Sequence, residues 1–292
     1  MSSTEHAAPR FAGIEDWPTA DLASALLETQ LAAVAAAASA TGALAQAIDA
    51  AAERLAKGGR LIYLGAGTSG RLAVLDAAEL PPTFNWPPER AVALMAGGPD
   101  AVVNAVEGAE DSVTEAPAAL KALSLTAVDV VIGVAASGRT PYVRAGLAAA
   151  KAIGALTLGI TNAPEAPLAT EADIALTAAT GAEIIAGSTR MKAGTAQKVL
   201  LNCLSTGIMI KLGFVYRGRM IEMRPTNDKL HARAVAMVSD LTGESVEAAE
   251  KALKVGGDIK TAVAMLALNL DASAATARLK TKGGKLSAAL KD

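Results

Sequence analysis

Short apolar segments alternate with helical segments through the middle of this chain, and each apolar segment ends in glycine or another small residue. Five of them are rich in β-branched and aliphatic side chains, as buried strands are: RLIYLGAG, AVALMAGG, DVVIGVAAS, ALTLGIT and IALTA. Helical stretches such as PYVRAGLAAAKAIGA lie between them. Because strands joined by crossover helices pair in parallel, the pattern predicts an α/β fold with a doubly wound parallel sheet.

Helical regions flank the predicted sheet. The alanine-rich region 21–57 is predicted to be helical with a break near Thr41-Gly42, and another helix is expected at about 191–212. Beyond Thr226, Thr242-Gly243 and Gly256-Gly257 separate short helical patterns that predict a small domain of three helices. The expected domains are an N-terminal arm with helices at 1–57, the sheet domain at 58–225 and a small helical domain at 226–292.

The composition argues against several classes of partner. The chain has 292 residues and a formal net charge of −2, which gives no electrostatic reason to expect nucleic acid or an anionic membrane. Only eight residues are Phe, Tyr or Trp, too few for a surface that stacks on bases. Residues 29–48 carry no charge, but most are alanine, so we predict a soluble helix that packs on a neighbour rather than a membrane span.

The cysteine usage and the N-terminal sequence indicate a cytoplasmic protein. The single cysteine, Cys203, lies in the apolar stretch KVLLNCLSTGIMIK and is expected to be a small buried side chain rather than a nucleophile. One thiol cannot form an internal disulfide, which fits a reducing cytosol. The sequence MSSTEHAAPRF has no basic region followed by an apolar one, so no signal peptide is expected.

A glycine-rich turn follows the first predicted strand. Gly65, Gly67 and Gly70 have the spacing that seats a dinucleotide pyrophosphate at a helix N-terminus, although Thr68 and Ser69 add two hydroxyls inside it. A dinucleotide site also requires an acidic residue at the end of the next strand, and AVALMAGG contains none. The motif leaves three possibilities open: a pocket for a phosphomonoester, which we favour, a dinucleotide site, or a turn without a ligand.

Two further segments are expected to bring hydroxyl groups to the same edge of the sheet. Ser137 and Thr140 lie in AASGRTPY at the end of another predicted strand, and Ser188 lies in AEIIAGSTRMKAGT at the front of a predicted helix. Parallel strands end at one edge, and ligands bind there. Free backbone N–H groups, helix dipoles and hydroxyls together suit a phosphate group.

Four segments resemble the N-acetylmuramic acid 6-phosphate etherases, which belong to the sugar isomerase (SIS) fold superfamily: LIYLGAGTSGRLAVLDAAELPPTF, VEGAEDS, GVAASGRTPYV and GSTRMKAGTAQKVLLN. The resemblance covers about residues 58–232 and includes NDKLHAR, and a helical C-terminal region is also a family feature. One departure is visible near the N-terminus. Thr4-Glu5 is followed by HAAPRFAGIEDW instead of the short Asn- and Ser/Thr-containing stretch that is usual in the family.

The resemblance implies cleavage of the ether between D-lactate and C3 of N-acetylmuramic acid 6-phosphate, a step in the recycling of cell-wall sugars. The products would be N-acetylglucosamine 6-phosphate and D-lactate. Direct hydrolysis is difficult because an alkoxide is a poor leaving group. Elimination from the open-chain aldehyde, followed by addition of water, avoids this and needs two acid–base groups but no metal or other cofactor.

The resemblance also implies roles for individual residues. Glu79 in AAELPPTF is expected to protonate the leaving group and activate water, and Glu110 in EGAEDS is expected to remove the C2 proton. Taken from the residues alone, the favoured interpretation is non-catalytic: Glu79 as an exposed carboxylate at a helix end before Pro81-Pro82, and Glu110 as part of a solvated acidic patch. His231 is expected either to assist ring opening or binding, or to be a surface histidine. The other expected substrate-binding residues are Thr68, Ser69, Ser137, Arg139, Thr140, Ser188 and Lys192, with Arg71 and Arg190 flanking the same motifs.

Two other functions remain open on the same scaffold. A non-catalytic regulator that binds a sugar phosphate would need the hydroxyl-bearing loops but neither glutamate. An aldose–ketose phosphate isomerase has no group to expel at C3. Because both Glu79 and Glu110 are present in their motifs, the sequence favours the etherase.

The distance between the two halves of the expected site favours a homodimer. The helix that begins near Ser69 is expected to reach Glu79, roughly 15 Å farther along its axis at ~1.5 Å per residue. A hexose phosphate is shorter than that between its phosphorus and C3. Either the chain breaks early and folds Glu79 back, or Glu79 reaches the pocket of a second subunit. We favour the second arrangement, since SIS proteins are commonly dimers.

Overall fold

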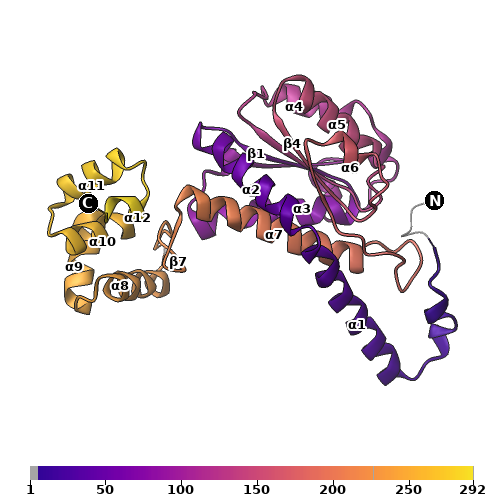
Figure 1. The fold of residues 1–292 in the computed structure, drawn as a ribbon, viewed down its shortest axis with the longest axis horizontal. Coiled ribbons are helices and arrows are strands. Elements are labelled where there is room, and N and C mark those ends of the chain that lie inside the picture. Colours follow the sequence, from indigo (N-terminus) through magenta and orange to yellow (C-terminus); the bar gives the residue numbers. More distant parts are fainter. Residues whose placement is uncertain (1–5, 226, 292) are drawn as a thin grey trace. The chain divides into compact units, whose positions relative to one another are not determined.

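The computed structural model describes residues 6–225 and 227–291 (Figure 1). Thr4, Glu5 and Thr226, which were considered above, lie outside the described residues. The chain divides into two compact units: Met1–Ala78 with Pro88–Thr206, and Glu79–Pro87 with Gly207–Asp292. Helices α3 (Gly67–Phe84) and α7 (Lys192–Leu212) each begin in the first unit and end in the second. The domain boundaries expected from the sequence stay a prediction.

The first unit is built on a five-stranded parallel sheet with the order β2-β1-β3-β4-β5. Its strands are β1 (Leu61–Gly65), β2 (Ala91–Met95), β3 (Val130–Val134), β4 (Leu156–Thr161) and β5 (Ile174–Thr177). The five predicted strands and their parallel pairing are therefore confirmed. One row of paired residues crosses the whole sheet: Met95, Gly65, Val134, Ile160 and Leu176. All five strands consequently end at the same edge.

Helices cover both faces of this sheet (Figure 1). On one face lie α4 (Glu115–Ala122), α5 (Pro141–Ala152) and α6 (Leu168–Glu171), and on the other lie α2 (Thr41–Ala56), α3 and α7. The first face buries an aliphatic cluster that includes Ile62, Leu64, Val131, Val143 and Leu147. Coverage on both faces explains why β1, β3 and β4 are buried along their whole length.

On the second face, a buried carboxylate links the sheet to α3 and α7. The Tyr63 hydroxyl donates to Asp76 Oδ2 at 2.9 Å, and the Ser205 hydroxyl donates to Asp76 Oδ1 at 3.1 Å. Burial, together with the neighbouring Asp76 carboxylate, raises the pKa of Tyr63 well above its ordinary value, so this hydroxyl stays a donor. The three side chains fix the position of α3 against β1 and α7.

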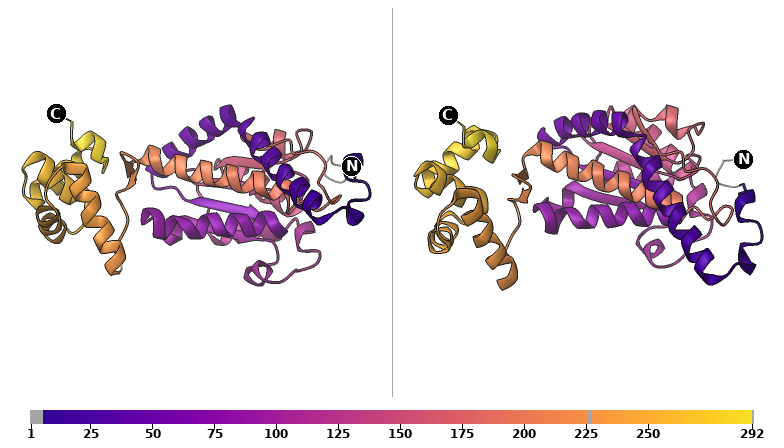
Figure 2. Two further views of the ribbon diagram at one scale, coloured as in Figure 1. Left: turned by 90° about the horizontal axis from the view of Figure 1, so that it is seen from below. Right: turned by 60° about the horizontal axis from the view of Figure 1, so that its bottom comes forward.

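The alanine-rich region forms two helices, α1 (Thr19–Ala38) and α2, so the predicted helices and the break between them are confirmed. In both views of Figure 2, α1 crosses α7, and there the Thr195 hydroxyl donates to the Gln30 side-chain oxygen. By length and composition alone, α1 could span a membrane. It packs through small residues such as Ala33, whereas Leu27 and Leu31 are 69% and 73% exposed.

The expectation that Cys203 is buried is wrong, because the thiol is exposed on α7. The apolar stretch around Cys203 lies within α7, and this helix has one buried side and one exposed side. Leu200, Leu201 and Leu204 face inward, and Cys203 lies with Asn202 on the opposite side. Position around the helix, rather than the hydropathy of the stretch, decides which of these side chains is buried.

The second unit contains a short antiparallel pair and five helices within residues 207–291. The strands are β6 (Val215–Tyr216) and β7 (Arg219–Met220), and the helices are α8 (Asp228–Thr242), α9 (Val246–Gly256), α10 (Ile259–Leu268), α11 (Ala272–Thr281) and α12 (Leu286–Ala289). A core of residues such as Val238, Leu253, Val263 and Leu286 holds the helices together.

The prediction of three helices in this region is therefore wrong. The glycines in Thr242-Gly243 and Gly256-Gly257 marked two of the breaks, since Gly243 and Gly257 end α8 and α9 with φ values of +78° and +80°. A further break was missed at Asn269, which ends α10 in the same left-handed conformation with φ +51°. Asp271 then caps α11 by accepting the N–H of Ala274 at 2.8 Å.

At the opposite edge of the sheet from the strand ends, an ion pair joins the starts of β1 and β3. Both Asp129 oxygens accept hydrogen bonds from the Arg60 guanidinium, at 3.0 Å and 2.7 Å. The Thr126 N–H and hydroxyl also donate to Asp129, at 2.8 Å and 3.0 Å. Burial favours the neutral carboxyl, but the hydrogen bonds from Arg60 and Thr126 outweigh it and hold the pKa of Asp129 below its ordinary value.

We predict that Asp129→Asn lowers the free energy of unfolding by about 1.5–3 kcal/mol at neutral pH, because charged hydrogen bonds are lost. The folded-state pKa lies below the unfolded value of about 3.9, so the stabilisation is complete above that pH and is lost as the pH falls through the folded-state pKa. Urea unfolding at a series of pH values measures this. The difference between wild type and variant should shrink below about pH 4.

The matched control is Glu53→Gln, which neutralises an exposed carboxylate on α2. This change should alter the unfolding free energy by less than about 0.5 kcal/mol. A constant difference between wild type and Asp129→Asn down to strongly acidic pH would contradict the assigned role of the carboxylate.

Candidate functional site

The glycines of the first loop allow α3 to begin directly against β1. A Cβ atom on Gly65 would lie 2.7 Å from the Cα of Gly70, and a Cβ on Gly70 would lie 2.8 Å from the carbonyl oxygen of Gly65. Neither position therefore accepts a side chain without movement of the backbone. The close approach places Thr68 and Ser69 in the first turn of α3, at the carboxyl end of the sheet.

Hydrogen bonds between loops tie together the segments that follow β3, β4 and β5. The Asn162 N–H donates to the Ala136 carbonyl at 3.0 Å, and the Ala178 N–H donates to the Thr161 carbonyl at 2.9 Å. Gly138 also accepts the N–H of Leu168 at 3.2 Å. The loop after β3, which carries Ser137, is thus joined to the segments that follow β4 and β5 at the carboxyl edge of the sheet.

Side chains extend this network to the first loop. The Ser69 hydroxyl donates to Gln197 Oε1 at 2.9 Å, and Gln197 Nε2 donates to Asn162 Oδ1 at 3.0 Å. Asn162 Nδ2 then donates to the Ala178 carbonyl at 3.1 Å. Gln197 is 1% exposed and Asn162 is 0% exposed, so this chain of hydrogen bonds is closed to water along most of its length.

The loop after β3 carries Ser137, Arg139 and Thr140. Gly138 has φ +62°, and a Cβ there would lie 2.5 Å from the Cβ of Ala166, so the turn requires glycine. Ser137 Oγ accepts the Arg139 N–H at 3.3 Å, and the Arg139 side chain is exposed. Thr140 precedes the first turn of α5, and its side chain forms no capping hydrogen bond. Pro141 at the first position of α5 has no N–H, so this N-terminus offers an anion the amide groups that follow Pro141 and a positive dipole end.

The N-terminus of α7 is arranged differently, because Glu183 occupies it. This carboxylate is fully buried and accepts the N–H groups of Lys192 at 3.0 Å and Ala193 at 2.9 Å. Lys192 Nζ donates to the Thr180 carbonyl at 2.9 Å, and Ser188 is half-buried in the preceding turn. The substrate-binding roles expected of Lys192 and Ser188 stay predictions.

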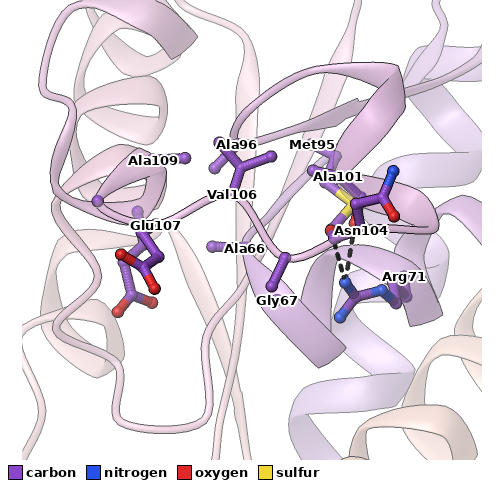
Figure 3. Close-up of a pocket in the computed structure, with 13 residues that line it drawn as sticks. Ala66, Gly67, Arg71, Met95, Ala96, Ala101, Asn104, Val106, Glu107 and Ala109 are labelled. Carbon is purple, nitrogen blue, oxygen red and sulfur yellow. Dashed lines mark hydrogen bonds between the residues drawn. The ribbon is translucent and has the colours of Figure 1, made fainter.

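A cavity of about 340 Å³ lies beside the first loop (Figure 3). Its lining includes Glu107 and Glu110 from the loop that follows β2, together with Gly67 and Arg71 from α3. Figure 3 shows Glu107 and Arg71 on opposite sides of this cavity, with Ala66 and Gly67 between them. Glu110 lies in a short 3-10 turn, Ala109–Asp111, and is exposed. Its carboxylate is thus available to a ligand in the cavity.

Arg71 holds the loop that carries these glutamates. Its Nε donates to the Val102 carbonyl at 2.8 Å, and its Nη2 donates to the carbonyls of Ala101 and Asn104 at 2.9 Å and 3.1 Å. A residue that the sequence placed among the ligands of a phosphate or a carboxylate therefore has a structural role.

Glu79 and His231 belong to the second unit. Glu79 is exposed on α3, which continues without interruption to Phe84 even though it contains Pro81 and Pro82. The early break that was considered for Glu79 is therefore absent. His231 is exposed on α8. The roles expected of both residues stay predictions.

Sequence reasoning missed the three polar residues that organise the loops, namely Asn162, Glu183 and Gln197. A signal was present for Gln197. It lies in register with Ala193, Ala196, Leu200 and Leu204 on the buried side of α7, where a polar residue must find a hydrogen-bond partner. Among the described residues, no group of three or more His, Cys, Asp and Glu side chains could hold a metal ion.

Comparisons with known proteins agree with this architecture. A model of the glucokinase regulatory protein N-terminal SIS domain matches residues 43–151, and a model of the SIS domain matches residues 111–206. A phosphoheptose isomerase from Francisella tularensis has a similar structure, with a TM-score of 0.50, 20% identity and coverage of 66% of this chain and 98% of that chain. The parallel sheet and the loops at its carboxyl edge thus define a domain of the SIS class.

The particular family follows from closer relatives. An N-acetylmuramic acid 6-phosphate etherase from Deinococcus radiodurans is 49% identical over 282 residues, which cover 96% of this chain and 92% of the relative. Another from Lactobacillus gasseri is 54% identical over 248 residues, covering 85% and 84%. The chain belongs to the N-acetylmuramic acid 6-phosphate etherase family and is an enzyme, a carbon–oxygen lyase.

We predict that Arg71→Lys loosens the loop around Glu107 and Glu110. One ammonium group cannot reproduce the three hydrogen bonds of the guanidinium, and the loss of two bonds worth roughly 1 kcal/mol each raises local opening by about 30-fold. Cleavage by a glutamate-specific protease measures this opening. The control, Arg139→Lys, changes an exposed arginine and should leave the cleavage rate unchanged; equal rates in all three proteins would refute the role of Arg71.

Proposed function

We propose that this chain cleaves the D-lactyl ether of N-acetylmuramic acid 6-phosphate, releasing D-lactate and N-acetylglucosamine 6-phosphate. The observation that carries the proposal is the 49% identity to an etherase over 96% of the chain. The presence of Glu79 and Glu110 in the motifs where the resemblance implies a catalytic pair supports it. A regulator without catalysis would need neither carboxylate.

The reaction proceeds by elimination and hydration. Opening of the sugar ring gives an aldehyde that acidifies the C2 proton, a carboxylate removes that proton, and lactate leaves from C3 with a proton from a second group. Water then adds to C3 of the unsaturated aldehyde, and C2 is protonated again. Glu110 is the group that exchanges the C2 proton, and Glu79 protonates lactate and activates water. The exposure of both carboxylates leaves them free to accept protons from a ligand.

The substrate phosphate binds at the loop 137–140, before the first turn of α5. Pro141, the first residue of α5, has no N–H, so the groups that suit an anion here are the amide groups that follow Pro141, the Ser137 hydroxyl and the Thr140 side chain, which forms no capping hydrogen bond. The alternative anion site, at the start of α7, is taken by the Glu183 carboxylate. Arg139 is exposed beside the loop and adds a positive charge.

The active form is a cytoplasmic homodimer that acts on a small sugar phosphate without a metal or another cofactor. The continuity of α3 supports a site shared between subunits, because Glu79 does not fold back toward the start of its own helix. The exposed apolar side chains of Leu27, Leu31 and Val34 on α1 are suited to contact with a second copy. Neither nucleic acid nor a membrane is a partner.

The elimination route predicts where solvent atoms appear in the product. Reaction in water labelled with deuterium and ¹⁸O should place deuterium at C2 and ¹⁸O at C3 of N-acetylglucosamine 6-phosphate, as measured by mass spectrometry and NMR. Cleavage on the lactyl side of the ether would instead leave the C3 oxygen unlabelled. That result would exclude elimination.

A shared site predicts that two inactive variants complement each other. Glu79→Gln and Glu110→Gln should each lose at least about 100-fold in kcat, since each removes an acid–base group. In a mixed dimer, one site would hold both wild-type glutamates, so activity should rise toward one quarter of the wild-type value after subunits exchange. Release of D-lactate measures it.

The control for this complementation is each variant carried through the same exchange with itself. If mass spectrometry detects mixed dimers while activity remains at the level of the parents, both glutamates serve one subunit and the shared site is refuted. A chain that binds N-acetylglucosamine 6-phosphate but never releases D-lactate would be the sugar-phosphate-binding regulator.

A further inference from the structure

The buried hydrogen bonds that end at Ser69 have a single allowed direction. Ala178 contributes a main-chain carbonyl, which can only accept, and Asn162 must therefore turn its NH₂ group toward it. The Asn162 oxygen then faces Gln197, so Gln197 must donate a hydrogen bond to it from its NH₂ group. The Gln197 oxygen is left to face Ser69, and the Ser69 hydroxyl must donate its proton to it.

Reversing this direction would place two acceptors against each other in a region closed to water. If both amides turned over, the Asn162 oxygen would meet the Ala178 carbonyl at a position where both residues are fully buried. An unpaired buried acceptor is costly, and no solvent reaches it to compensate. The main-chain carbonyl at the far end thus determines where the serine proton lies.

Ser69 is 9% exposed and lies in the first turn of α3, two residues after Gly67, which lines the candidate cavity. With its proton committed to Gln197, the oxygen offers a ligand only lone pairs. A phosphate dianion carries only acceptor oxygens and gains nothing from such a partner. A sugar hydroxyl or an amide N–H can donate to it.

We propose that Ser69 is a hydrogen-bond acceptor for an O–H or N–H group of the sugar, not a ligand of its phosphate, and that Gln197 is the positioning residue that imposes this polarity. This inference rests on the proposed function for the identity of the ligand. It changes the expectation drawn from the sequence, in which Ser69 and Ser137 both bind phosphate. In this arrangement Ser137 binds the phosphate of the substrate and Ser69 binds its sugar.

The test compares two ligands by isothermal titration calorimetry, inorganic phosphate and N-acetylglucosamine 6-phosphate. Ser69→Ala should weaken the sugar phosphate by roughly 2- to 10-fold and leave inorganic phosphate unchanged, since only a neutral hydrogen bond is lost. The matched control, Ser137→Ala, should weaken both ligands by about 10- to 150-fold, since a hydrogen bond to a charged group is lost. Equal weakening of both ligands by Ser69→Ala would overturn the proposal, and so would no effect on either.

A second variant separates binding from folding. Ser69→Cys keeps a proton for Gln197 but replaces the oxygen with a weak acceptor, so it should reproduce the selective loss of sugar affinity with an unchanged thermal midpoint. Gln197→Met removes the partner that directs the hydroxyl and retains the side-chain volume. If Gln197 imposes the polarity, the Ser69 hydroxyl is no longer held as an acceptor in Gln197→Met, so adding Ser69→Ala there should weaken N-acetylglucosamine 6-phosphate less than it does in the wild-type background. Absence of that dependence would refute the role of Gln197.

Glucose 6-phosphate distinguishes the two donors on the sugar. It has hydroxyls but no N–H, so an effect of Ser69→Ala that is confined to N-acetylglucosamine 6-phosphate identifies the amide as the donor. An effect on both sugar phosphates identifies a hydroxyl. Failure of the wild-type protein to bind N-acetylglucosamine 6-phosphate while it binds inorganic phosphate would contradict the proposed function instead, and the other measurements would then be made with glucose 6-phosphate.

Discussion

The in-register pairing of five parallel strands is the constraint on which the rest of the site depends. Because Met95, Gly65, Val134, Ile160 and Leu176 form one row across the sheet, the following loops all leave from the same edge. Loops far apart in sequence can then exchange hydrogen bonds directly. The close contact of Gly65 with Gly70 brings α3 to this edge as well, and with it Thr68 and Ser69.

Polar groups buried near this edge give the loops defined positions. Glu183 accepts hydrogen bonds from two N–H groups at the start of α7, and Arg71 donates hydrogen bonds to three carbonyls of the loop before Glu110. Asn162 and Gln197 join the loops after β4 and β5 to the start of α3. Each of these side chains would be costly to bury alone, and together they leave Ser137, Thr140 and Glu110 as groups that a ligand can reach.

Much of the fold could be predicted because its signals are local. A strand buried on both faces is a continuous apolar run, and glycine marks its end, so all five strands were recognised. The break at Asn269 was missed because a left-handed residue at the end of a helix is usually glycine, and here it is asparagine. The exposure of Cys203 depends on which side of α7 its side chain occupies, and the hydropathy of the stretch does not show this. The roles of Arg71 and Gln197 depend on long-range partners; Gln197 is 128 residues from Ser69, and a single sequence does not reveal such a pair. The catalytic roles proposed for Glu79 and Glu110 rest on family resemblance and not on local physics.

We therefore propose that the two ends of a sugar phosphate bind at different places along one sheet edge, the phosphate at the loop after β3 and the sugar at the start of α3. A crystal structure of the protein with N-acetylglucosamine 6-phosphate tests this most directly. Phosphate oxygens are expected within hydrogen-bond distance of Ser137 Oγ and of the amide groups that follow Pro141 in α5, with a sugar O–H or N–H group on Ser69 Oγ. A phosphate seated on Gly67, Thr68 and Ser69 at the start of α3 would contradict the proposal.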